Sequence, residues 1–332
     1  MNHQLQSSTT PYCVALEFMM NYSPVLLFRG IVVCAAIAIA GCTTTEEKET
    51  QPQYGKTPAI HAIQTEYVFA IHPLLNSRRY FEVYQPLVAY INRYAKEFTI
   101  RLESSKDYSH FEEKLIARKF HFALPNPYQT VQATRYGYTI FGKMSDDDQF
   151  RGIIVVRNDS HIHSIEDLRG KAISFPSVTA LAAAMMPKYF LKSNGLDVEN
   201  EAECRYVGSQ ESSIMNVFLG KTVAGCTWPP PWESFINDHP EVKEAMRIQW
   251  QTNPLINNGL IVRDDVPIQH RNIFSQIMFS LHTHAEGKEI LQRIHLSQFV
   301  GISQSEYVSR VNIFLRKYET LFGSLPGIGG RN

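Results

Sequence analysis

Strand-like and helix-like segments alternate twice along the chain, and this alternation restricts the fold more than any other feature of the sequence. In the first series, short β-rich runs are separated by stretches with apolar residues at helical spacing. That series comprises residues 66–71, 80–94, 99–102, 108–118 and 120–124. A second series comprises residues 171–175, 180–194, 205–207, 212–219 and 223–227. Because strands that alternate with helices form sheets covered by helices, the sequence predicts an α/β fold with mostly parallel sheets.

The remaining segments connect the two series. Residues 151–156 form a predicted strand that leaves the first series, residues 165–171 form a short helix and turn, and residues 260–263 form a return strand. Three predicted helices close the chain, at residues 269–281, 287–294 and 304–322. We therefore expect one lobe from residues 65–149 plus 254–332 and another from residues 150–253, with a ligand cleft at their junction. The crossings near Asp148–Gly152 and Trp250–Asn253 are expected to act as a hinge.

The composition fits such a molecule. The chain has 332 residues, 44% of them hydrophobic, which is enough for two buried cores. Lys plus Arg total 32 and Asp plus Glu total 32, so the surface as a whole does not attract nucleic acid or anionic lipid. We expect a monomer that binds no nucleic acid, and any preference for anions must be local.

The N-terminal region predicts export and a lipid anchor. Arg29 precedes an apolar run at residues 31–40, which is shorter than the roughly 20 residues that a membrane-spanning helix needs. The tetrad at residues 39–42 (IAGC) resembles a bacterial lipobox, so residues 1–41 are interpreted as a signal peptide and Cys42 as the lipidated residue. The alternative is a buried helix that ends in Gly-Cys. Because residues 1–18 contain no Lys or Arg, the true start is expected at Met19 or Met20.

The segment after Cys42 and the remaining cysteines complete this interpretation. Residues 42–64 are polar and are predicted to tether the fold to a membrane in the periplasm. Thr43 after the cysteine favours the outer membrane, and the inner membrane stays open. Once the signal peptide is removed and Cys42 is acylated, Cys204 and Cys226 are the cysteines left in the fold. Whether they pair is open, because a disulfide needs its two Cα atoms within about 7 Å.

Three junctions between a predicted strand and a predicted helix carry the polar residues of a candidate site. They are Asn126 to Tyr128, Ser177 to Ala180 (Ser177, Val178, Thr179 and Ala180), and Ser209 to Ser212 with Gln210 between them. The first amides of a helix have no partner within it and face the crevice at the carboxyl ends of strands, so these junctions suit an anion. Simpler interpretations remain for two of them: Tyr128 can pack in the core, and Ser177 with Thr179 can serve as a helix cap only.

Several stretches in order along residues 69–322 resemble the phosphate/phosphite/phosphonate-binding proteins of ABC importers. They are FAIHP (69–73), FALPNPY (122–128), DLRGK (167–171), SVTA (177–180), GSQESSIMNV (208–217) and TWPPPW (227–232). The resemblance implies a two-lobed type II periplasmic-binding fold. It also implies that Tyr128 and the Ser177 to Thr179 turn bind phosphonate or phosphate oxygens for delivery to an ABC permease.

This sequence departs from the family pattern at three positions. Val178 interrupts a turn that has three hydroxyls in phosphonate binders, Gln210 replaces a histidine, and Trp228 or a neighbour stands where an aspartate meets an amine. These differences predict a phosphonate-like oxyanion with an apolar or planar substituent rather than an aminoalkyl phosphonate.

Other polar residues were weighed in the same way. His72, on the loop after the first strand, is a candidate ligand residue, and nearby Arg78 and Arg79 are more typical of solvated surface charges. The run Asp146 to Asp148 lacks the twelve-residue calcium loop, and no zinc spacing is present, so we expect no metal and no cofactor.

Two alternative functions stay open. A lobe pair closed by a ligand can feed a membrane sensor kinase or cyclase instead of a permease. A periplasmic hydrolase is disfavoured, because G-x-S-x-G, H-E-x-x-H and Walker motifs are all absent from the sequence. The chain is therefore not expected to be an enzyme.

Overall fold

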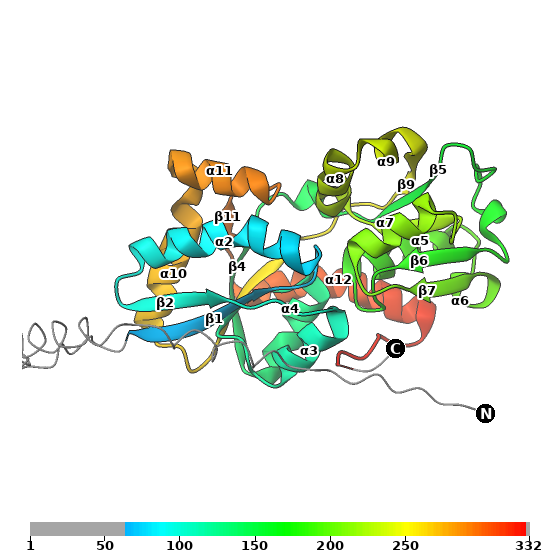
Figure 1. Cartoon of the computed structure of the whole chain (residues 1–332). Coiled ribbons are helices and arrows are strands. Elements are labelled where there is room, and N and C mark those ends of the chain that lie inside the picture. The colour runs from blue at the N-terminus through cyan, green and yellow to red at the C-terminus, as the bar shows by residue number, and fades with distance from the viewer. Residues whose placement is uncertain (1–63, 330–332) are drawn as a thin grey trace, which may run out of the picture. The chain divides into compact units, whose positions relative to one another are not determined.

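Two β-sheets, each covered by helices, organise the part of the chain that the computed structural model describes, residues 64–329 (Figure 1). The predicted signal peptide and Cys42 lie outside the described residues, as does almost all of the predicted tether. Within residues 64–329, no helix is both long enough and apolar enough to cross a membrane.

The first lobe is built on a six-stranded sheet with the order β11-β4-β10-β3-β1-β2. Its strands are β1 (Thr65–Ile71), β2 (Phe98–Leu102), β3 (Phe122–Leu124), β4 (Tyr138–Met144), β10 (Gly259–Arg263) and β11 (Phe299–Gly301). Its helices are α2 (Ser77–Tyr94), α3 (Tyr108–Ile116), α4 (Pro127–Ala133), α10 (Ile268–Ser280), α11 (Ala285–Arg293) and α12 (Gln304–Phe322), with short 3-10 turns at η1 (Thr134–Tyr136) and η5 (Leu281–Thr283). The apolar faces of these elements pack into one large core.

The second lobe is built on a five-stranded sheet with the order β7-β6-β8-β5-β9. Its strands are β5 (Ile153–Arg157), β6 (Ala172–Phe175), β7 (Glu203–Tyr206), β8 (Ala224–Thr227) and β9 (Met246–Gln251). Its helices are η4 (Leu181–Met185), α5 (Met186–Ser193), α6 (Val198–Glu201), α7 (Gln210–Phe218), α8 (Pro229–Asp238) and α9 (Pro240–Ala245), with a 3-10 turn at η3 (Glu166–Leu168). Two smaller apolar clusters fill this lobe, one on each side of its sheet.

The two-lobed α/β fold predicted from the sequence is confirmed, but the sheets are mixed rather than mostly parallel. In the first sheet β1 pairs in parallel with β2 and β3, whereas β10 is antiparallel to both β3 and β4. In the second sheet β6 pairs in parallel with β7 and β8, whereas β5 is antiparallel to β8 and β9. The strands that run opposite to the others are β5 and β10, each the first strand after a crossing, and β11 at the edge of the first sheet.

The chain passes between the sheets twice, from β4 to β5 and from β9 to β10. The first crossing contains the 3-10 turn η2 (Asp147–Gln149). The lobe boundaries at residues 149/150 and 253/254 stay predictions, because both fall inside these crossings. Helix α12 contacts elements of both lobes, including α4 and β4 of the first and α5 of the second (Figure 1).

Candidate ligand-binding site

A narrow cavity, with room for about one water molecule in this arrangement of the lobes, lies where side chains of the two lobes meet. Three residues of the first lobe, one of the first crossing and six of the second lobe line it. They are His72, Tyr108 and Asn126, then Phe150, then Ala180, Leu181, Ala182, Ala183, Gln210 and Trp228. Five of these, His72, Asn126, Ala180, Gln210 and Trp228, are among the site residues predicted from the sequence.

The second lobe contributes the beginning of a helix to this cavity. Residues 181–185 form a single π-helical turn that continues directly into α5. The amides of Leu181, Ala182 and Ala183 have no acceptor within the helix and none among the described residues. Because short alanine side chains leave the backbone uncovered, these amides and the positive end of the helix can contact an anion directly.

Two side-chain amides, one from each lobe, add neutral donors. Asn126 caps α4, where its Oδ1 accepts from the backbone amide of Gln129 at 3.1 Å. Its Nδ2 donates to the Thr179 carbonyl of the other lobe at 3.0 Å. The Oε1 of Gln210 accepts from the Thr227 hydroxyl at 2.8 Å. Each amide nitrogen has two hydrogens and one partner among the described residues, so one N–H of each is left for a ligand.

Tyr108 crosses between the lobes and supplies a hydroxyl. It is the first residue of α3, yet its ring packs in an apolar cluster of the second lobe. Its hydroxyl oxygen accepts from Gln210 Nε2 at 2.9 Å. Burial raises the pKa of Tyr108 well above its usual range, so the hydroxyl keeps its proton. Because the oxygen serves as the acceptor toward Gln210, its proton is available for a ligand.

His72 is fully buried beside these donors. Its Nδ1 lies 3.0 Å from the Leu124 carbonyl oxygen, and its ring meets the Tyr108 ring edge to face at 5.9 Å between centroids. Burial lowers the pKa of His72 to about 4, with the Leu124 hydrogen bond opposing the shift. The imidazole is therefore neutral at physiological pH.

The rest of the cavity wall is apolar. Trp228 and Phe150 lie against each other with ring centroids 5.3 Å apart, and Trp228 is 2% exposed. None of the ten lining residues has a carboxylate, ammonium or guanidinium group. An anion in this cavity would meet neutral hydrogen-bond donors on one side and aromatic carbon on the other.

The other predicted site residues lie outside this cavity. Ser177 lines a wider groove next to it, which Tyr108 also borders, and Val178 is partly exposed. Ser209 caps α7: its hydroxyl oxygen accepts from the backbone amide of Ser212 and its hydroxyl donates to the Ser212 hydroxyl. A ligand role for these residues remains a prediction.

Two predicted anion donors already have acceptors within the protein. The Tyr128 hydroxyl donates to the carbonyl of Pro326, and neither residue lines the cavity. The Thr179 hydroxyl donates to the carboxylate of Glu112 in the first lobe.

Glu112 connects three segments beside the cavity. Its carboxylate accepts from the Thr179 hydroxyl, from Gln129 Nε2 at 2.8 Å and from the Gly329 amide at 3.0 Å. Burial raises the pKa of Glu112, partly offset by these three donors. The contact joins the two lobes and holds the chain segment after α12 against α3 and α4.

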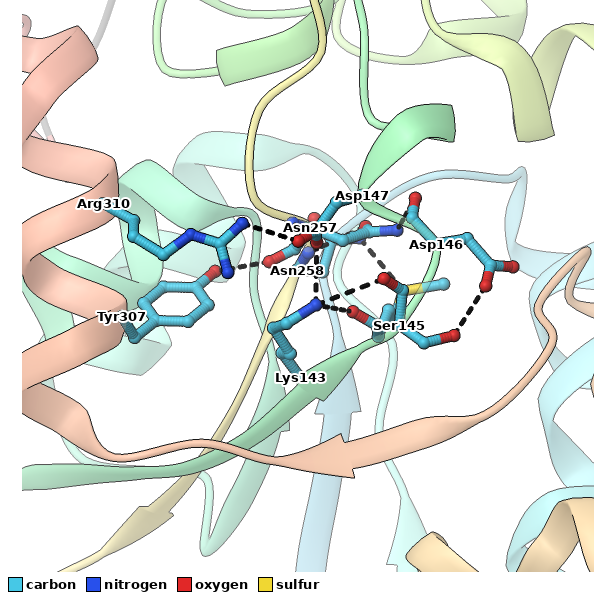
Figure 2. Close-up of polar contacts among 9 residues, drawn as sticks. Lys143, Ser145, Asp146, Asp147, Asn257, Asn258, Tyr307 and Arg310 are labelled. Carbon is cyan, nitrogen blue, oxygen red and sulfur yellow. Dashed lines mark hydrogen bonds and ion pairs between the residues drawn. The ribbon is translucent and has the colours of Figure 1, made fainter.

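A polar cluster around Asp147 ties the two crossings together (Figure 2). Its carboxylate lies 2.7 Å from Lys143 Nζ, 2.8 Å from Arg310 Nη2 and 2.9 Å from the Asn257 amide. The Tyr307 hydroxyl donates to the Asn257 carbonyl at 2.7 Å. Figure 2 shows Tyr307 and Arg310 reaching the cluster from the same helix, which is α12. The acidic run at residues 146–148 thus contributes to an ion-paired junction of both crossings.

Sequence reasoning missed Tyr108, Phe150 and the amides of residues 181–183 as parts of the cavity. The run Ala-Leu-Ala-Ala-Ala at 180–184 was a usable signal, because several small residues at a predicted helix start leave the backbone open to a ligand.

No group of three or more His, Cys, Asp or Glu side chains suited to a metal ion occurs within residues 64–329.

Comparison with protein families gives a match over residues 69–307 to the family described as ABC transporter, phosphonate, periplasmic substrate-binding protein. The chain belongs to this family. The match includes both crossings and most of both lobes, and it ends within α12. The members of this family are substrate-binding components of transporters, and the sequence resemblance inferred above is confirmed.

Individual relatives are distant. The chain is 20% identical over 174 residues to the probable phosphite-binding protein PhnD1 of Prochlorococcus marinus, a match that spans 48% of this chain and 59% of that protein. A binding protein component of a Pseudomonas aeruginosa phosphonate transporter is 17% identical with a TM-score of 0.71, covering 77% of this chain and 88% of that one. The P. marinus PhnD1 structure with methylphosphonate is 16% identical with a TM-score of 0.68, covering 76% and 98%. At these identities the structural likeness establishes the shared fold.

Proposed function

We propose that this protein captures a small tetrahedral oxyanion, phosphonate-like or phosphate-like, in the cavity between its lobes and delivers it to an ABC permease. The observation that carries this proposal is the set of neutral donors around one cavity: three helix-start amides, the amides of Asn126 and Gln210, and the Tyr108 hydroxyl. Micromolar binding needs about 8 kcal/mol, and hydrogen bonds to a charged partner contribute about 1.5–3 kcal/mol each. Six such donors can therefore hold an anion without an ion pair.

The donors come from both lobes, and this supports a closure mechanism. Tyr108 and Asn126 belong to the first lobe, whereas Gln210 and the amides of residues 181–183 belong to the second. A ligand held by both sets is bound fully only when the lobes meet, so it favours the closed arrangement by its differential affinity. The crossings joined at Asp147 would absorb the rotation.

Isothermal titration with methylphosphonate, phosphite and phosphate tests the binding function. We expect heat from at least one of the three, and loss of that heat in Ala182→Val, whose added methyl groups would fill the cavity beside the free amides. Ala285→Val, the same change at the exposed first residue of α11 and away from the cavity lining, serves as the control and is expected to bind normally. An absence of heat with all three ligands would contradict the proposal.

We also propose that the protein is a periplasmic lipoprotein anchored through Cys42, and that it is not an enzyme. The lipobox-like tetrad supports the anchor, and family membership supports a transport role. Metabolic labelling with a palmitate analogue should mark the wild type and leave Cys42→Ser unlabelled. The sensor alternative would be favoured if deleting a neighbouring permease gene left ligand-dependent growth unchanged while deleting a sensor kinase or cyclase gene abolished the response.

A further inference from the structure

His72 differs from every other polar group of the cavity in what it offers a ligand. A carbonyl oxygen cannot donate, so the 3.0 Å contact with Leu124 requires that the hydrogen sit on Nδ1 of the ring. A neutral imidazole with its hydrogen on Nδ1 has a lone pair on Nε2. Nε2 has no partner among the described residues and His72 lines the cavity, so the ring atom left for a ligand is an acceptor.

The other polar groups with free capacity are donors. The three amides, the second N–H of Asn126 and of Gln210, and the Tyr108 hydroxyl can all donate to ligand oxygens. The carbonyl oxygens of the two side-chain amides are already used, by the Gln129 amide and the Thr227 hydroxyl. The cavity therefore combines many donors with one side-chain acceptor.

We propose, resting on the proposed oxyanion function, that His72 selects a ligand that brings its own proton: the singly protonated monoanion of a phosphonate, phosphite or phosphate. The P–OH group donates to Nε2, and the remaining oxygens accept from the donors. A dianion or a sulfonate of the same shape has only acceptor oxygens, so one of them would face the Nε2 lone pair with no hydrogen between them. Leaving a buried polar pair unmatched in this way disfavours binding strongly.

The matched ligands methylphosphonate and methanesulfonate test this, because they share shape and differ in the acidic proton. At about pH 6 we expect the wild type to prefer methylphosphonate by at least about tenfold, or 1.4 kcal/mol. Alkylphosphonates lose their second proton in the near-neutral range, as phosphate esters do with a pKa of about 6. Affinity for methylphosphonate should therefore fall as the pH rises to about 9. The affinity for methanesulfonate should stay constant.

The environment of His72 simplifies this pH test. Tyr108 is the one other titratable side chain among the ten lining residues, and burial keeps it protonated over this range. No charged group contributes to the lowered pKa of His72. Glu112 lies beside the cavity and burial raises its pKa, so the affinity for methanesulfonate at the same pH values separates a titration of the site from a titration of the ligand.

Two variants complete the test. His72→Phe keeps a ring in place without an acceptor and should bring the two ligands to within about threefold of each other. His161→Phe, a matched change at an exposed position of the second lobe, should keep the wild-type preference. If His72→Phe does not fold, the wild-type comparison of the two ligands decides alone. Equal wild-type affinities for both ligands would overturn the role of His72 while leaving the oxyanion site intact, whereas no binding of any oxyanion would overturn both proposals.

Discussion

Replacing Asp147 by Asn tests whether the two crossings are fastened at a single carboxylate. The Asp147 carboxylate contacts Lys143, Arg310 and the backbone amide of Asn257. Lys143 is the more buried of the two cations, with 8% of its side chain exposed. An asparagine keeps the size and one acceptor oxygen but loses the charge. Lys143 would then be a buried ammonium with carbonyl acceptors only, those of Met144 at 3.0 Å and Ser145 at 3.2 Å.

The magnitude follows from the exposure of each partner. Removing one member of a fully buried ion pair costs about 3–5 kcal/mol, but here 29% of the Asp147 side chain is exposed and two carbonyls still accept from Lys143. The Arg310 pair, with 42% of the arginine side chain exposed, adds no more than about 1 kcal/mol. We therefore expect Asp147→Asn to lower the free energy of unfolding by about 2–3 kcal/mol.

Urea denaturation followed by tryptophan fluorescence measures this change. Asp148→Asn is the matched control, because Asp148 is the next residue and its carboxylate contacts just the exposed side chain of Gln149. The control should change the free energy of unfolding by less than about 0.5 kcal/mol. The reasoning is refuted if both variants lose the same stability, or if Asp147→Asn loses less than about 1 kcal/mol.

Three further predictions concern the cavity and its surroundings. Because His72 titrates near 6.5 when unfolded and at about 4 when folded, the unfolded state binds the extra proton between these values. Stability should therefore fall as the pH drops from about 6.5 to 4, by about 3 kcal/mol from this residue, and His72→Phe should flatten that slope in acid denaturation curves. Thr179→Val removes a donor to buried Glu112 and should lower the free energy of unfolding by about 1–3 kcal/mol, with the loss largest above the raised pKa of Glu112, where the carboxylate is charged. Gln210→Leu should weaken ligand binding in titration calorimetry at least tenfold, since it also removes the hydrogen bond that orients Tyr108; an unchanged affinity would exclude both donors from the site.

Long, strongly patterned elements were predictable from the sequence. Helix α12 spans the residues expected, 304–322, because its apolar spacing is regular and Ser303 caps it at the start. Strands β4, β9 and β11 were not predicted. Strand β11 has three residues, too few for any periodicity, and its identity comes from its pairing with β4. Helix α8 begins with three prolines, which the first turn of a helix tolerates but which are equally typical of an extended segment.

The site was predictable in outline but not in its exact position along the chain. The sequence indicated that a helix beginning after β6 would face the cleft, and such a helix lines the cavity. The helix-start amides beside the cavity belong to residues 181–183, because a π-helical turn begins there, and a ligand role for the turn at 177–179 stays a prediction. The entry of Tyr108 into the other lobe is a tertiary contact, and no local pattern encodes it.

The contacts made by the chain after α12 determine where this protein can be shortened or extended without harm. The Pro326 carbonyl accepts from the Tyr128 hydroxyl, and the Gly329 amide donates to the Glu112 carboxylate. Glu112 also accepts from Thr179 of the second lobe. A fragment that stops at Phe322 would leave a buried carboxylate with one donor fewer and a buried phenol without its acceptor. Ligand affinities measured on such a fragment would be those of a protein that lacks these two contacts. Reporter groups and fused domains are therefore better placed on the exposed surface of the second lobe than at the end of the chain.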